Sequence, residues 1–304
     1  MSKKTLVIIG ARGIGDLIYL LPLLRSLYNE YKEKLYILSN KVNHAKHVYN
    51  NESFYEEIRY FDNNRFNFFK TILNILSFRD QINSYKVDQL ILTSNATRLI
   101  IPVLLSNIKK KIIFGQGNFL INKDKSLNHL TMSERLMAYT NNLKLNHKSQ
   151  NFFLKKTINQ KNKLNKNFFI SVDSHHDQNN WNLQNYIKLI NNIKNYNKIY
   201  INFSPNKKYF LKSFPKKYFK SKKIEFTYKK NISEIIEIIS KCDVVIGNES
   251  GPVCLASSLR KTVHAIYLPL HTKPESKIIY DKNYYYNTQK NSPDRIINKI
   301  ISLL

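Results

Sequence analysis

Residues 243–259 read Asp-Val-Val-Ile-Gly-Asn-Glu-Ser-Gly-Pro-Val-Cys-Leu-Ala-Ser-Ser-Leu. An apolar run of strand length, 244–246, leads through a turn of small and polar residues into an apolar helical stretch. Ser250 is suited to the N-cap of that helix and Pro252 to its first turn, where a missing N–H is tolerated. Because free N–H groups at a helix N-terminus bind anions, the turn is either a diphosphate site or simply a well-capped turn.

The seven glycines of the chain are confined to a few loops that follow apolar runs. These loops hold Gly10, Gly13 and Gly15, then Gly115 and Gly117, then Gly247 and Gly251. Glycine is expected where a side chain does not fit, at positive φ or at a close approach of the backbone. The first and last loops lead into helical stretches, so each is a nucleotide-binding strand–turn–helix unit or an ordinary tight turn of an α/β fold.

Apolar runs of strand length alternate with longer helical stretches along most of the chain, which predicts parallel sheets with right-handed crossovers. The expected strands are 5–9, 34–38, 57–61, 89–93, 111–114, 168–172, 198–203, 224–228, 244–247 and 262–268. The expected helices are 16–31, 66–85, 97–107, 131–143, 183–193, 233–242, 252–259 and 292–304.

A Lys/Asn-rich stretch with few large apolar residues, 155–167, predicts a linker between two domains of similar architecture. The expected domains are residues 1–154 and 168–304. A length of 304 residues suffices for two domains, each with its own core. Two such halves, each with a nucleotide-type turn, indicate a two-domain enzyme with its site between them.

Composition excludes several classes of protein. The chain is 42% hydrophobic, as expected of a folded protein. Its two cysteines, Cys242 and Cys254, form no CxxC pattern, so we expect neither a disulfide scaffold nor a zinc site. We expect the protein to be located in the reducing cytoplasm. The apolar start is only of strand length and no run approaches about 20 apolar residues, so we expect no secretory leader and no membrane span.

The formal net charge is +28, and one segment of the chain is especially rich in lysine. Residues 207–230 contain ten lysines and a single acid, Glu225, with aromatic residues interleaved. Such a stretch is either a solvated lysine surface or a patch that attracts the phosphates of a nucleic acid, a nucleotide or anionic lipid headgroups.

The N-terminal motif is Gly10-Ala-Arg-Gly-Ile-Gly-Asp16. Its GxxGxG spacing is not the dinucleotide fingerprint, and no Gly-Lys-Ser/Thr follows as in a P-loop. Asp16 lies at the carboxyl end of a predicted parallel strand, where such folds bind ligands. It is either an N-cap of the following helix or a general base for an acceptor hydroxyl.

The C-terminal motif, Gly247-Asn-Glu-Ser-Gly-Pro252 followed by Leu255-Ala256, resembles the donor-site signature of the ADP-heptose:lipopolysaccharide heptosyltransferase family, glycosyltransferase family nine. That signature usually reads Gly-Asn-Asp-Thr/Ser-Gly-Pro and then His-Leu-Ala. Two further segments resemble the family: Gly13-Ile-Gly-Asp16 with Pro22, and 171–181, ending in Trp181, with Asn185-Tyr186 after it.

The resemblance implies a GT-B fold, α/β with two Rossmann-like domains facing across a cleft, the first binding the acceptor and the second the nucleotide sugar. It implies an inverting transferase that needs no metal ion or other cofactor, with Asp16 as the base. The donor-binding residues it implies are Ser174, Asn179, Asn248, Glu249, Ser250, Gly251 and Pro252. The acceptor-binding residues it implies are Arg12, Gly13 and Gly15.

The chain departs from the family pattern at three of these motif positions. Glu249 replaces the usual Asp and would orient the donor sugar through a longer side chain. Cys254 stands where the family usually has His. Asn179 falls near the family's basic residue that contacts the donor phosphates, a loss that a lysine from elsewhere would have to cover.

The sequence therefore predicts a cytoplasmic glycosyltransferase, peripheral on the inner membrane. It would move a heptose-like sugar, most simply from an ADP-sugar, to a cell-envelope glycolipid such as the lipopolysaccharide core. Its basic and aromatic surface would hold it at the anionic inner leaflet. One alternative is a basic nucleic-acid-binding α/β protein, but the sequence contains no motif that reads nucleic acid, so we expect no nucleic acid as a partner. Another alternative is a catalytically silent GT-B scaffold.

Overall fold

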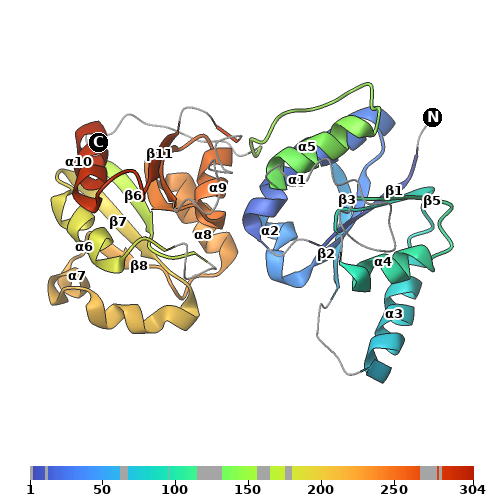
Figure 1. Ribbon diagram of the computed structural model, residues 1–304, viewed down its shortest axis with the longest axis horizontal. Helices are drawn as coiled ribbons and strands as arrows, with labels where there is room; N and C mark the ends of the chain where they lie inside the picture. Colours follow the sequence, from blue (N-terminus) through green and yellow to red (C-terminus); the bar gives the residue numbers. More distant parts are fainter. Residues whose placement is uncertain are drawn as a thin grey trace. The chain divides into compact units, whose positions relative to one another are not determined.

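The structure is a computed structural model that describes residues 3–10, 13–61, 68–94, 96–114, 132–155, 165–174, 180–267, 279–280 and 283–304. The chain divides into two compact units, unit 1 (Met1–Phe152) and unit 2 (Phe153–Leu304), each built on its own sheet (Figure 1). The predicted linker 155–167 lies mostly outside the described residues, and its last two residues belong to a strand instead.

Unit 1 contains a five-stranded parallel sheet in the order β3-β2-β1-β4-β5. Its strands are β1 (Thr5–Ile9), β2 (Leu35–Asn40), β3 (Tyr55–Phe61), β4 (Gln89–Leu92) and β5 (Lys110–Ile113). Every residue of β1 and β4 is buried, as expected for central strands covered on both faces.

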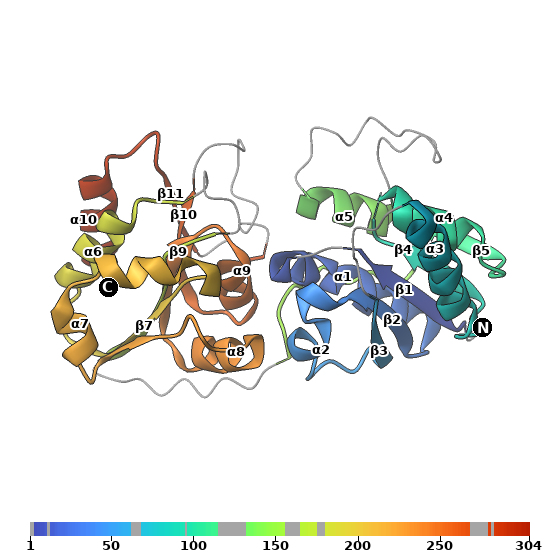
Figure 2. The same ribbon diagram turned by 90° about the horizontal axis from the view of Figure 1, so that it is seen from below.

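Helices cover both faces of this sheet. They are α1 (Ile14–Tyr31), α2 (Ala45–Val48), α3 (Phe68–Asn83), α4 (Thr97–Leu104) and α5 (Met132–Asn142), with a short 3₁₀ turn, η1 (Lys41–Asn43). Helix α1 packs against α2 and α5, whereas α3 packs against α4, and the two groups lie on opposite faces of the sheet (Figures 1 and 2).

Unit 2 contains a six-stranded sheet in the order β11-β10-β9-β6-β7-β8, again parallel throughout. Its strands are β6 (Lys166–Ser171), β7 (Tyr196–Asn202), β8 (Ile224–Phe226), β9 (Val244–Asn248), β10 (Thr262–Tyr267) and β11 (Tyr284–Asn287). Its helices are α6 (Leu183–Asn192), η4 (Pro205–Ser213), α7 (Lys216–Lys220), α8 (Ile232–Lys241), α9 (Gly251–Ser258) and α10 (Pro293–Leu303).

One face of this second sheet carries α6, α10, η4 and α7, and the other carries α8 and α9 (Figure 2). A cluster of buried apolar side chains joins the sheet to α6 and α10 and includes Tyr186 and Trp181. Among the described residues, no helix has both the length and the apolar character needed to cross a membrane.

The predicted α/β alternation is confirmed, with differences at the ends of elements. Helix α1 begins at Ile14 and not at the predicted Asp16. Strand β6 begins at Lys166, inside the predicted linker. The basic stretch after β7 was not predicted to be helical, yet it forms η4 and α7.

Candidate functional site

Both sheets reverse their strand order next to a strand that has a glycine at or just after its carboxyl end. In unit 1 the chain passes from β1 to β2 and β3 on one side, then to β4 and β5 on the other. In unit 2 it passes from β6 to β7 and β8, then to β9, β10 and β11 on the other side. Open α/β sheets bind ligands at the carboxyl ends of the strands where this reversal occurs. The two sequence motifs follow β1 and β9, and so lie at these switch points.

Close packing explains a glycine at each switch point. A Cβ on Gly10 would lie 2.4 Å from the Cβ of Ser94, which follows β4. A Cβ on Gly247 would lie 2.8 Å from the carbonyl oxygen of Ser171, its neighbour on β6. Both distances are shorter than real Cβ contacts, so each glycine lets the two strand ends approach.

In unit 1, Asp16 is placed at the first turn of α1, next to the switch point. Gly13 is the N-cap, so Asp16 is the third residue of the helix and not its N-cap as one alternative expected. Asp16 Oδ2 accepts the backbone N–H of Gly13 at 3.1 Å. Since Gly13 has no side chain, only the Asp16 half of a capping box is possible. Gly15 lies in the same turn, and Arg12 lies outside the described residues.

In unit 2, the side chain of Asn248 is fully buried and connects residues 247–252, the motif turn, to the segment before α6. Its Oδ1 accepts the N–H of Trp181 at 2.8 Å, and its Nδ2 contacts Asn180 Oδ1 at 3.4 Å. Asn180 Oδ1 also accepts the N–H of Ser174 at 2.5 Å. The end of β6, the segment before α6 and the distant end of β9 are thus brought together at the carboxyl edge of the sheet, in part through the predicted residues Ser174 and Asn248.

Two hydroxyls at this edge are buried without a partner in the described part of the chain, those of Ser171 and Ser250. Ser250 does occupy the N-cap position of α9, and its carbonyl accepts the N–H of Cys254 at 3.0 Å. Its Oγ, however, makes no capping hydrogen bond. A buried hydroxyl without a partner costs about 1–3 kcal/mol, so each of these groups is suited to meet a ligand.

The other residues of the motif turn complete the edge. Glu249 is half-buried, and its N–H bonds to the carbonyl of Ile266 on β10 at 3.0 Å. Gly251 and Pro252 are the first two residues of α9 and are half-buried. The free N–H groups of the first turn of α9 point to the same edge as the turn itself.

Sequence reasoning missed Asn180 and a buried polar cluster beside it. Asp173 Oδ2 accepts the N–H of Ser204 at 3.1 Å and its hydroxyl at 2.7 Å. Lys207 Nζ lies 3.6 Å from the same carboxylate oxygen and 3.4 Å from the carbonyl of Ser174. The available signal was the abrupt change from the apolar strand to Asp173-Ser174 at its end.

Some predicted site residues lie outside the part of the chain that the structure describes, and others form no site within that part. Asn179 lies outside the described residues. Within the described ranges, no group of three or more His, Cys, Asp or Glu is placed to hold a metal ion. Cys242 and Cys254 are both buried, and burial raises the pKa of the Cys242 thiol to about 12.

Solved structures share this architecture at low sequence identity. A glycosyl transferase of family 9 from Veillonella parvula is 14% identical, with a TM-score of 0.73 over 95% of this chain and 87% of that one. The ADP-heptose LPS heptosyltransferase II of E. coli is 14% identical, with a TM-score of 0.72 over 99% of this chain and 98% of that one. The E. coli heptosyltransferase WaaC with ADP is 12% identical, with a TM-score of 0.70 over 98% of both chains.

These neighbours are GT-B glycosyltransferases, so the predicted GT-B fold is confirmed. No curated protein sequence matches the chain. Residues 118–299, more than half of the chain, match the profile of glycosyltransferase family 9 (heptosyltransferase). The chain belongs to this family and is a glycosyltransferase.

Proposed function

We propose that the protein transfers a heptose-like sugar from an ADP-sugar to a hydroxyl group of a cell-envelope glycolipid such as the lipopolysaccharide core. The transfer inverts the anomeric centre and uses no metal ion. Support for the donor comes from the solved neighbours, since WaaC of E. coli was determined with ADP and with ADP-2-deoxy-2-fluoro heptose.

The observation that carries this proposal is the pair of unpartnered buried hydroxyls at the switch point of unit 2. Ser171 is the last residue of β6 and Ser250 follows β9, so the two residues lie at the carboxyl ends of neighbouring strands. A diphosphate at the N-terminus of α9 would accept hydrogen bonds from its free N–H groups and from the Ser250 hydroxyl. The same groups stabilise the charge that grows on the leaving diphosphate during transfer.

The chemical step needs one proton acceptor and one leaving group. The acceptor hydroxyl oxygen attacks the anomeric carbon on the face opposite the diphosphate and forms the new glycosidic bond. The old bond from that carbon to the diphosphate oxygen breaks, and the nucleoside diphosphate departs with the electron pair. Asp16 takes the hydroxyl proton, and Glu249 accepts hydrogen bonds from the hydroxyls of the donor sugar.

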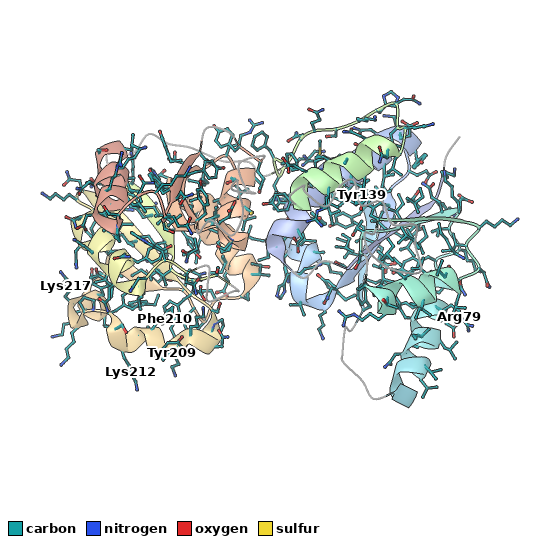
Figure 3. All side chains as sticks on the ribbon, in the orientation of Figure 1. Arg79, Tyr139, Tyr209, Phe210, Lys212 and Lys217 are labelled. Carbon is teal, nitrogen blue, oxygen red and sulfur yellow. The ribbon has the colours of Figure 1, made fainter. Side chains whose placement is uncertain are left out.

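A basic surface on unit 2 supports the proposed membrane partner, the anionic inner leaflet. Nine of the ten lysines in 207–230 are exposed. Tyr209 and Phe219 are 61% and 52% exposed among them. Figure 3 shows Lys212 and Lys217 at the outer edge of unit 2, on η4 and α7. Lysines attract anionic headgroups, and aromatic side chains insert at the headgroup level.

The donor site can be tested with nucleotides alone. We expect ADP, and not GDP, UDP or CMP, to raise the melting temperature of the protein, since a ligand at about 100 times its Kd stabilises by about 2.7 kcal/mol. Gly251→Val should abolish this rise, because a branched side chain at the start of α9 blocks the approach of the diphosphate.

Gly251→Ala is the matched control and should keep part of the ADP-dependent rise, because it adds only one methyl group. Both variants should melt close to the wild-type protein without nucleotide. A folded Gly251→Val protein that still responds fully to ADP would contradict the proposed donor site. A wild-type protein that responds to none of the four nucleotides would contradict the proposed function.

A further inference from the structure

Lys207 differs from the other lysines of the basic stretch. It is the one buried lysine among the ten in 207–230, with 9% of its side chain exposed. A kink in η4, at Lys207 itself, interrupts the helical backbone. Lysine is almost never buried unless its charge is paired, because removing an ammonium from water costs several kcal/mol. Its placement therefore needs a reason beyond the solubility that explains the exposed lysines.

Asp173, the charge partner of Lys207, has hydrogen-bond donors other than this lysine. Asp173, 4% exposed, already accepts two hydrogen bonds from Ser204. The distances from Lys207 Nζ, 3.6 Å to Asp173 and 3.4 Å to the Ser174 carbonyl, exceed the 2.7–2.9 Å usual for a charge-assisted hydrogen bond. Buried ion pairs contribute little net stability compared with apolar residues of similar size. Folding alone is therefore a weak reason to keep this pair.

A diphosphate bound at the carboxyl edge of the unit 2 sheet would need a cation to balance its negative charge. Segments 171–174, 180–182 and 248–252 meet there and contain two carboxylates, Asp173 and Glu249, but no lysine or arginine. A diphosphate carries several negative charges and would be repelled by such an edge. Lys207 lies at this edge. Its Nζ contacts the Ser174 carbonyl at 3.4 Å, and the N–H of Ser174 bonds to Asn180, which contacts Asn248 of the motif turn.

We propose that Lys207 is the cation that binds the diphosphate of the donor, with Asp173 holding its ammonium at the edge of the sheet. This inference rests on the proposed function, because it assigns a further binding residue to the same donor site. The ammonium would be shared between Asp173 and the diphosphate, so that the bound donor meets a positive charge that is already in place.

The test is isothermal titration with ADP and with adenosine, which lacks the phosphates. Lys207→Met should weaken ADP binding by about 10–100-fold, the effect of one hydrogen bond to a charged group. It should leave adenosine binding within about twofold of the wild type. Lys208→Met, at the exposed neighbour on the same helix, is the matched control and should leave the binding of both ligands unchanged.

Two further variants separate charge from folding. Asp173→Asn with Lys207→Met removes both charges, so no charge is left buried alone, and it should fold while still losing ADP affinity. Asp173→Asn alone keeps the ammonium, and the amide oxygen of Asn can still accept a hydrogen bond that holds it at the edge, so this variant should bind ADP at least as tightly as the wild type.

The inference is overturned if Lys207→Met binds ADP like the wild type, if it loses adenosine and ADP equally, or if Asp173→Asn loses as much ADP affinity as Lys207→Met. These outcomes leave the proposed function standing. A wild-type protein that does not bind ADP would overturn both.

Discussion

The Asp16 carboxylate accepts the N–H of Gly13 at 3.1 Å, and this contact stabilises the first turn of α1. The contact does not prevent a role in chemistry, because each carboxylate oxygen offers two lone pairs. It fixes the orientation of the group instead, which a general base requires. At the scale of this residue, one position at the switch point of unit 1 accounts for the contact with Gly13 and suits the proposed role of Asp16 as the base.

Asp16→Asn separates the two roles. The amide oxygen of Asn can still accept the Gly13 N–H, so the variant should lose only about 0.3–1 kcal/mol of stability, the interaction of the charge with the helix dipole. Loss of the base should lower the rate of sugar transfer by about 10²–10⁴-fold. Unfolding curves, an ADP titration and a transfer assay on one preparation measure these effects.

Glu234→Gln is the matched control for Asp16→Asn. Glu234 is also the third residue of a helix, α8, and its carboxylate accepts the N–H of the N-cap Asn231 at 2.8 Å. Its substitution should cost a similar small stability and leave transfer unchanged. Wild-type transfer by Asp16→Asn would show that Asp16 serves the helix alone.

Among the elements, the edge strand β11 and its neighbour β10 enclose a buried histidine of unit 2. The His264 ring is fully buried and stacks on Tyr284 and Tyr286, with centroids 4.8 Å and 5.9 Å away. Its Nδ1 lies 2.8 Å from the Tyr286 hydroxyl. Burial, with a smaller effect from the charge of Lys166, lowers the pKa of His264 to about 4. The ring is therefore neutral in the folded protein at neutral pH.

This strand pair should make the stability of unit 2 fall in acid. A histidine in the unfolded chain has a pKa of about 6.5, so between pH 6.5 and 4 the unfolded state binds the extra proton. Stability present above about pH 6.5 is then lost as pH falls, by up to about 1.4 kcal/mol per pH unit and about 3 kcal/mol in all. Urea unfolding at several pH values measures this slope.

His264→Asn removes the titrating ring and can keep a hydrogen bond to Tyr286. Its free energy of unfolding should be lower at pH 7.5 but should fall less steeply toward pH 4 than that of the wild type. Parallel slopes for the two proteins would show that other groups cause the acid sensitivity.

The elements also show what a sequence can predict. Strand β1 and the start of α6 match their expected positions, because the apolar pattern and the Asn182 cap that define them are local. The motif turn was located for the same reason. Helices η4 and α7 were missed because their lysine-rich pattern is typical of a surface, whereas Phe214 and Tyr218 join the core through tertiary packing. The burial of Lys207 and the hydrogen bond between Asn180 and Asn248 depend on contacts between residues that are distant in the sequence, and no local pattern reveals such contacts.

On the scale of the whole molecule, the net charge of +28 is the dominant physical property. Lysines spread evenly would give only weak, general attraction to anions, screened beyond about 8 Å at physiological salt. The basic surface 207–230 differs because nine exposed lysines fall within 24 consecutive residues and its single acid, Glu225, is paired with Lys198 at 2.6 Å. Clustering with exposed aromatic side chains, more than total charge, should decide membrane binding.

A comparison of two variants with equal net charge tests this idea. The patch variant changes four exposed lysines of η4 and α7 to Glu: Lys212, Lys216, Lys217 and Lys220. The control variant changes four exposed lysines of unit 1 to Glu: Lys86, Lys109, Lys144 and Lys148. Each lysine near an anionic surface contributes about 1 kcal/mol, so the patch variant should bind anionic vesicles at least about 100-fold more weakly than wild type at 0.15 M salt. The control should lose much less in the same co-sedimentation assay. Equal losses would assign binding to net charge, and no loss in either would show that these lysines are only a solvated surface.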